Sequence, residues 1–368
     1  MKGLRGGIWS CLLVAQTAAS PTPDVSRRAA EPHLITGLYS SAQEPAQIVI
    51  HDTAGKPSWT WSVKNAKGIS SALLQCMYSK CKKGLCVAPE QKWADGGNRV
   101  LAIQGTAAFL INHHPGRPTD KQVTFGICLN RDGMENSHTA ELLPDGKMVL
   151  STTNDAMTGN LRVFDTRAGQ DVDAAPVQEL DGIPATHSLV WDSANSLLWA
   201  ASNDKSPQSP GSRSILTAYK YSGGRFDAKP QVRQVISPAK QLTEEWGQNT
   251  PWWDGAHTMA PIPGQRKLLV STDSDVHAYD IGSGKLEHGG AVVQKYLGGF
   301  QPVGTRGSLP RSDIKSVSFL PDGKAVYVQA RWGAVTGTQV NVLAGGKRQD
   351  SIFNQELYKS RWFTGTTW

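Results

Sequence analysis

Three histidines and a lysine occupy equivalent places along the chain. His138, His187 and His257 each stand at the start of a short apolar segment, and the same offset from a Leu-Pro-Asp-Gly motif puts Lys315 in that place further on. Imidazole accepts or donates a proton near neutral pH, and it is a good ligand for zinc, copper, nickel or iron. If folding brings these side chains together, they form either an acid–base centre or a three-histidine site for one divalent metal ion.

A structural explanation for these histidines stays open beside the two functional ones. A histidine at the start of a strand can simply hydrogen-bond to a neighbouring segment. A lysine beside a metal ion is electrostatically unfavourable unless an anionic ligand lies between them. Both functional interpretations predict a cationic, hydrogen-bonding pocket that receives an anion.

Other side chains near the same segments are candidates for binding a ligand. Trp252 and Trp253 come shortly before His257, and indole faces stack on sugar rings. Arg331 follows the segment after Lys315 and is suited to pair with a carboxylate. Tyr39 closes the equivalent segment near the N-terminus and is a candidate acid. Core packing of the tryptophans and the tyrosine, and an ordinary surface position for Arg331, are the alternatives.

The segments that carry these residues repeat. Residues 143–147 and 320–324 both read Leu-Pro-Asp-Gly-Lys between two apolar segments, and related copies begin at Ser188 and Thr258. Proline fixes φ and glycine tolerates positive φ, so the motif predicts a tight turn between two β-strands. Units of four strands at intervals of about 50 to 70 residues are typical of propeller blades.

Two weaker copies precede these four. Residues 72–127 supply four strands, whereas residues 33–62 supply only three. The missing strand can come from Tyr358–Phe363, which would join the two ends of the chain and remove open sheet edges. The sequence therefore predicts an all-β, six-bladed β-propeller closed by a C-terminal strand. Seven blades is the alternative, because the connections before His257 and after Tyr296 are long.

The N-terminal residues are typical of a secretory signal. Lys2 and Arg5 precede the apolar stretch Ile8–Ala15, and small residues follow at Ala18-Ala19-Ser20. We expect a signal peptide over residues 1–20, a disordered leader over 21–32 and a single propeller domain over 33–368. The apolar stretch is shorter than the roughly 20 residues that a membrane span needs. The protein is therefore predicted to be secreted, without a membrane span.

The cysteines agree with export. Four cysteines follow the predicted signal peptide, and an even number in an exported chain favours two disulfides. Their spacing is wider than the CxxC of zinc ribbons. The pairing stays open among Cys76, Cys81, Cys86 and Cys128.

The formal net charge of +7 at pH 7 is spread along the chain. Basic arms that bind nucleic acid concentrate their charge, so an acidic glycan or a small anionic ligand is the better prediction. We expect no nucleic-acid partner and a monomeric protein.

Two segments resemble a known family. His138-Thr-Ala-Glu-Leu-Leu-Pro-Asp-Gly and His187-Ser-Leu-Val-Trp-Asp are similar to the blade signatures of an uncharacterised six-bladed propeller family in secreted bacterial and fungal proteins. The resemblance runs from about His33 onward and implies the fold. A more distant similarity is to propeller polysaccharide lyases, in which histidines near the axis, sometimes with a metal, act on uronic-acid glycans. This sequence departs from those enzymes in its apparent blade count and matches only their axial histidines.

Two functions from different classes follow as expectations. A lyase would neutralise a uronate carboxylate with Lys315, Arg331 or a metal, and one of the histidines would remove the adjacent proton. The alternative is a non-catalytic propeller that binds a glycan or a protein. A metal-dependent hydrolase or lactonase ranks third, because the aligned positions offer no carboxylate ligands.

Overall fold

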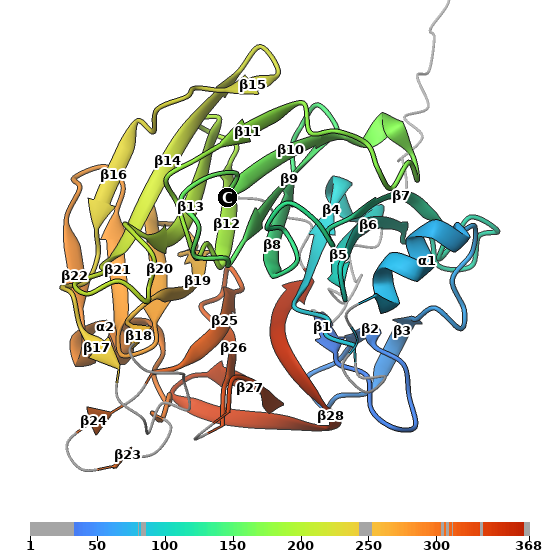
Figure 1. The fold of residues 1–368 in the computed structure, drawn as a ribbon. Coiled ribbons are helices and arrows are strands. Elements are labelled where there is room, and N and C mark those ends of the chain that lie inside the picture. The colour runs from blue at the N-terminus through green and yellow to red at the C-terminus, as the bar shows by residue number, and fades with distance from the viewer. Residues whose placement is uncertain are drawn as a thin grey trace, which may run out of the picture. The chain divides into compact units, whose positions relative to one another are not determined.

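The computed structural model describes residues 33–79, 81, 86–242, 252–302, 305–306, 309–310, 312–331 and 334–363. The predicted signal peptide (1–20) and leader (21–32) lie outside the described residues. Residues Pro32–Trp368 form one compact unit. The unit is all-β in character and is built from several antiparallel sheets (Figure 1).

Most sheets follow the order of the chain, and each begins with its innermost strand. One contains β4 (Glu90–Ala94), β5 (Arg99–Gln104), β6 (Ala107–Asn112) and β7 (Val123–Cys128). The next contains β8 (Ser137–Leu142), β9 (Lys147–Thr152), β10 (Leu161–Asp165) and β11 (Gln178–Leu180). It is followed by β12 (Ser188–Asp192), β13 (Leu197–Asn203), β14 (Ser214–Ser222), β15 (Arg225–Phe226) and β16 (Val232–Val235). Another contains β19 (Ala256–Pro261), β20 (Lys267–Thr272), β21 (Val276–Asp280) and β22 (Leu286–His288).

A seven-stranded sheet joins the two ends of the described chain. Its order is β25 (Ile314–Phe319), β26 (Ala325–Gln329), β27 (Gly337–Ala344), β28 (Lys347–Phe363), β1 (His33–Leu38), β2 (Gln47–His51) and β3 (Pro57–Trp61). The first part of β28 pairs with β27, and its last part pairs with β1, where Trp362 lies opposite Leu34. The part of β28 that pairs with β1 contains Tyr358–Phe363, the segment predicted to complete the first, three-stranded unit.

The remaining described elements are short. Two ribbons are β17 (Gln241–Leu242) with β18 (Trp252–Trp253), and β23 (Thr305–Arg306) with β24 (Leu309–Pro310). The helices are α1 (Ser71–Tyr78) and α2 (Gly290–Tyr296), with single 3₁₀ turns at Asp95–Gly97 and Thr166–Ala168. No helix of the described residues is long and apolar enough to cross a membrane.

The turns predicted from Leu-Pro-Asp-Gly are present. Gly146 donates its N–H to the carbonyl of Leu143 and has a φ of +82°, and Gly323 repeats this with Leu320 at a φ of +85°. Each glycine closes the hairpin between an innermost strand and the next strand, at β8–β9 and at β25–β26. The turn therefore fixes where the innermost strand begins and ends.

The sheets are arranged around a common centre, with one strand of each sheet innermost (Figure 1). The innermost strands contact one another in a closed ring. Its order is β4, β8, β12, β19, β25 and β28, and β28 contacts β4 again. Apolar side chains fill the space between neighbouring sheets, as where Trp61 of β3 packs on Phe109 of β6. Burial of one such side chain contributes roughly 1.5 to 3 kcal/mol. The first residues of the innermost strands therefore meet at one end of the axis.

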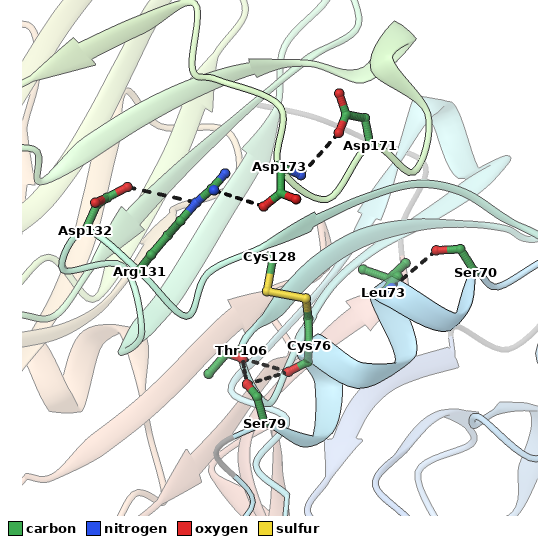
Figure 2. Close-up of a disulfide and its surroundings, with 10 residues drawn as sticks. All are labelled: Ser70, Leu73, Cys76, Ser79, Thr106, Cys128, Arg131, Asp132, Asp171 and Asp173. Atoms are coloured by element: carbon green, nitrogen blue, oxygen red, sulfur yellow. Dashed lines mark hydrogen bonds and ion pairs between the residues drawn. A yellow bond between two sulfur atoms is a disulfide. The ribbon is translucent and has the colours of Figure 1, made fainter.

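The four cysteines lie at disulfide distance in two pairs, Cys76–Cys128 and Cys81–Cys86. Cys76–Cys128 links α1 to the end of β7 (Figure 2). The side chain of Ser70 caps α1, and Thr106 donates to the carbonyl of Cys76. Closing a loop of 52 residues is worth about 4 kcal/mol on the chain-entropy account.

Candidate functional site

The histidines and the lysine of the sequence analysis are placed by a repeated irregularity at the start of the innermost strands. The register shifts by one residue across the strand pairs β8–β9, β19–β20 and β25–β26. In each pair the innermost strand has one residue more than its partner, and these unpaired residues are His138, His257 and Lys315, respectively. His187 directly precedes β12 and donates its N–H to the carbonyl of Ala201, which also faces Ser188. An extra residue of this kind, a β-bulge, re-aims its side chain. Here the bulges bring the four side chains to one cavity.

The side chains are in contact. The ring centroids of His138 and His187 are 5.4 Å apart, and those of His187 and His257 are 4.6 Å apart. Tyr358, from the register shift in β28, has its ring centroid 5.2 Å from that of His138. The cavity measures about 440 Å³ and is lined by Tyr39, Val87, Asn136, His138, Thr153, Ala185, His187, Asn203, Pro207, Trp252, Gly255, His257, Asp273, Lys315, Val335, Thr336 and Tyr358. We call it the histidine cavity.

Lys315 is held by two carboxylates. Its ammonium lies 2.6 Å from Asp313 Oδ1, 3.8 Å from Asp273 Oδ1 and 2.9 Å from His257 Nε2. His257, Asp273 and Asp313 are also the described His, Cys, Asp and Glu side chains whose ligand atoms gather within 4.8 Å of one another. The lysine ammonium thus already occupies the neighbourhood where these groups would hold a cation. Two carboxylates balance its charge, so Lys315 does not make the cavity positive.

His187 has a defined tautomer. Its Nδ1 lies 2.9 Å from the carbonyl oxygen of Ala185, and a carbonyl only accepts, so Nδ1 carries the proton. Nε2 is therefore the basic nitrogen. Burial, followed by the charges of His257 and His138, holds the pKa of His187 well below its ordinary value. The imidazole is therefore neutral at pH 7, and the Nε2 lone pair carries no proton.

His138 is neutral for a similar reason. Burial, and then the nearby Lys359, lower the pKa of His138 to about 3. Its Nδ1 is buried without a hydrogen-bond partner among the described residues. A buried polar atom without a partner is uncommon and marks a place where a ligand or water can bind.

Tyr358 and His257 form a chain that ends at Asp273. Asp273 Oδ1 lies 2.6 Å from His257 Nε2, and Tyr358 Oη lies 3.4 Å from His257 Nδ1. Burial by itself would raise the pKa of Asp273, but His257 and Lys315 hold it below its ordinary value. Burial raises the pKa of Tyr358 well above 10, so the phenol keeps its proton at neutral pH. The site thus holds the neutral imidazoles of His138 and His187 beside the protonated phenol of Tyr358.

A layer of paired charges lies deeper along the axis. Lys359 is fully buried, and its Nζ donates to the carbonyls of His138 and His187 and lies 3.3 Å from Glu90 Oε2. Arg361 Nη1 lies 2.5 Å from Glu90 Oε1. Burial lowers the pKa of Lys359 to about 7. These contacts hold the backbone that carries His138 and His187.

Of the four predicted ligand-binding residues, two line the histidine cavity and two do not. Trp252 and Tyr39 line the histidine cavity. Trp253 is beside Trp252 in β18 but is not among the lining residues, and Arg331 is likewise absent from the lining. The guanidinium of Arg331 lies 2.6 Å from Glu356 Oε1, near the protein surface.

Three residues of the site, Asp273, Asp313 and Tyr358, were not predicted from the sequence. Asp273 follows the second strand of its sheet, at the position that Thr153 and Asn203 occupy in the preceding two sheets, and all three line the cavity. Aligning this second position, as well as that of the histidines, would have found Asp273. Tyr358 carries no such signal, because its strand comes from the far end of the chain.

No protein-family model matches the sequence, and no curated protein is detectably similar. Among solved structures, a chain of the mitotic checkpoint complex is 11% identical over 97% of this chain and 93% of its own length, with a TM-score of 0.47. A hypothetical selenium-binding protein from Sulfolobus tokodaii is 11% identical over 92% of this chain and 94% of its own, with a TM-score of 0.46. Hydrazine synthase from Kuenenia stuttgartiensis is 14% identical over 69% of this chain and 70% of its own, at 0.40. At these values the similarities assign no function.

Proposed function

We propose that this protein is a secreted six-bladed β-propeller whose histidine cavity is the acid–base site of a lyase acting on uronate-containing glycans. The ring of contacts between innermost strands and the pairing of β28 with both β27 and β1 support the blade count and the closure. Two disulfide pairs support export, because disulfides persist in oxidising compartments.

The observation that carries the proposal is a neutral base with a fixed tautomer in the same cavity as a protonated phenol. His187 Nε2 removes the proton on the carbon next to the uronate carboxylate. The electron pair forms a carbon–carbon double bond, and the bond from the neighbouring carbon to the glycosidic oxygen breaks. Tyr358 gives its proton to that leaving oxygen. The products are an unsaturated uronate end and a free hydroxyl end, and proton exchange with solvent restores His187 and Tyr358.

His257 and Asp273 position the acid. The carboxylate of Asp273 holds His257 Nε2 at 2.6 Å, and the other ring nitrogen faces Tyr358 Oη. An imidazole oriented by a buried carboxylate is a common support for a proton-transferring group. His138 offers its unpartnered Nδ1 to the substrate, and Trp252 offers an indole face to a sugar ring. A metal ion held by His138, His187 and His257 is the alternative use of the same side chains.

The test is product formation from a panel of uronate polymers. Incubation of the purified mature protein with polygalacturonate, alginate and glucuronate-containing gums should yield unsaturated ends that absorb in the ultraviolet. His187→Ala should lose that activity, whereas His114→Ala, outside the cavity, should keep it. Turnover unchanged in His187→Ala would refute the assignment of the base.

A non-catalytic binding propeller is the second candidate, and Lys315 favours it. Both Asp273 and Asp313 compensate the lysine charge, so Lys315 offers little net positive charge to a bound uronate carboxylate. Glycan binding measured by calorimetry without any turnover, and with equal affinity in His187→Ala, would establish this candidate in place of the lyase.

A further inference from the structure

A second pair of histidines lies on the outer strands of the β19–β22 sheet, apart from the histidine cavity. His277 in β21 is directly opposite His288 in β22, and Asp275 comes just before β21. Directly opposed residues have Cβ atoms only about 5 Å apart. The three residues, together with Asp254, line a separate cavity of about 420 Å³.

His277 is the unusual member of this group. It is only 2% exposed, and neither of its ring nitrogens has a hydrogen-bond partner among the described residues. Buried polar atoms nearly always have a partner, so two unpartnered nitrogens in one ring need an explanation. Neutral imidazole is the form that binds metal ions.

His288 and Asp275 supply further ligand atoms beside this ring. His288 Nδ1 lies 3.2 Å from Asp275 Oδ2, and the ring centroids of His277 and His288 are 5.9 Å apart. The His288 side chain is 68% exposed, so it can turn without disturbing the core. In the described structure these atoms are not gathered within 4.8 Å of one another. Binding therefore needs His288 to rotate toward His277.

We propose that His277, His288 and Asp275 bind one divalent transition-metal ion of the zinc class at this sheet edge. Two imidazoles and one carboxylate suit zinc, cobalt or nickel, whereas calcium and magnesium prefer oxygen ligands only. Water or Asp254 completes the coordination. The ion would cross-link β21 and β22, the strands that carry His277 and His288.

The experiment uses the purified mature protein, which is treated with a chelator and then titrated with Zn²⁺ by calorimetry and with Co²⁺ by visible absorption. Wild-type protein should bind one equivalent and give a Co²⁺ spectrum with histidine ligation. His288→Ala, a change at an exposed position, should weaken binding at least tenfold, because even indirect ligand supports are worth roughly 10- to 100-fold. His277→Leu, which keeps the buried volume, should weaken it similarly.

Two matched controls separate this site from the others. His114→Ala removes a histidine outside both cavities, and His187→Ala removes one from the histidine cavity; both should bind Zn²⁺ as wild type does. Binding that is lost in His187→Ala and kept in His288→Ala would move the metal to the histidine cavity and overturn the proposal. Absence of stoichiometric binding to the wild type would overturn it as well.

Discussion

Lys315 and Lys359 are both buried at the axis, but their surroundings differ. Lys315 lines the histidine cavity between two aspartates, and its ammonium also contacts His257. Lys359 lies deeper, where it shares Glu90 with Arg361 and donates to two backbone carbonyls. The deeper layer uses its charges to hold strands together. The cavity instead contains the neutral imidazoles of His138 and His187, and Nδ1 of His138 has no hydrogen-bond partner among the described residues. The deeper layer is thus structural, whereas the cavity is suited to chemistry.

The largest expected effect is a loss of activity in variants of the histidine cavity. His187→Ala should lower kcat for glycan cleavage by roughly 10²- to 10⁴-fold, which is the usual contribution of a general base. Tyr358→Phe removes only the hydroxyl and should lower kcat by a similar factor, with little change in KM. Steady-state kinetics on the best polymer substrate measures both. A fall in kcat of less than threefold in either variant would remove that residue from the mechanism.

The next effect tests the structural layer. Lys359→Met should destabilise the fold by about 3 to 5 kcal/mol, because it leaves Glu90 less compensated and two carbonyls without their donor. Urea unfolding followed by tryptophan fluorescence measures the change. Lys324→Met, at an exposed turn, is the control and should change stability by less than about 0.5 kcal/mol. Equal stabilities of the two variants would contradict the structural role of the deeper layer.

The pH dependence of catalysis follows from the lowered pKa of His187 and the raised pKa of Tyr358. The pKa of His187 is held well below 6.5, so the base stays neutral and active as the pH falls through 6.5. The pKa of Tyr358 is raised well above 10, so the acid keeps its proton as the pH rises toward 10. We expect kcat/KM to be flat between about pH 6 and pH 9. An acid limb with a midpoint near 6.5 would mean that an unperturbed histidine is the base.

The smallest expected effect concerns the rim of the cavity. Trp252→Ala should raise KM roughly fivefold while kcat changes little, because a stacked sugar ring contributes on the order of 1 kcal/mol. Trp253→Ala is the matched control, since Trp253 does not line the cavity. Initial-rate measurements over a range of substrate concentrations separate the two. The same rise in KM for both variants would assign the loss to disruption of β18 and not to a sugar contact.

Much of the architecture could be predicted from local sequence. The paired Leu-Pro-Asp-Gly turns and the repeated strand patterns predicted an all-β protein, and antiparallel sheets with those hairpins are present. The equivalence of His138, His187, His257 and Lys315 was visible because each occupies the same offset from a turn. Turns and strands depend mainly on residues close together in the chain, so they can be predicted without knowledge of the tertiary structure.

The rest depended on contacts between distant segments. Tyr358 reaches the cavity because β28 pairs with β1 across more than 300 positions, and Asp273 meets His257 only across neighbouring strands. Which cysteines pair, and whether Lys315 gives the cavity a net charge, were likewise decided by packing. The sequence by itself determined which side chains stand at the starts of the innermost strands. Only the tertiary structure decided their partners and protonation, because burial and electrostatic coupling depend on every segment that surrounds a group.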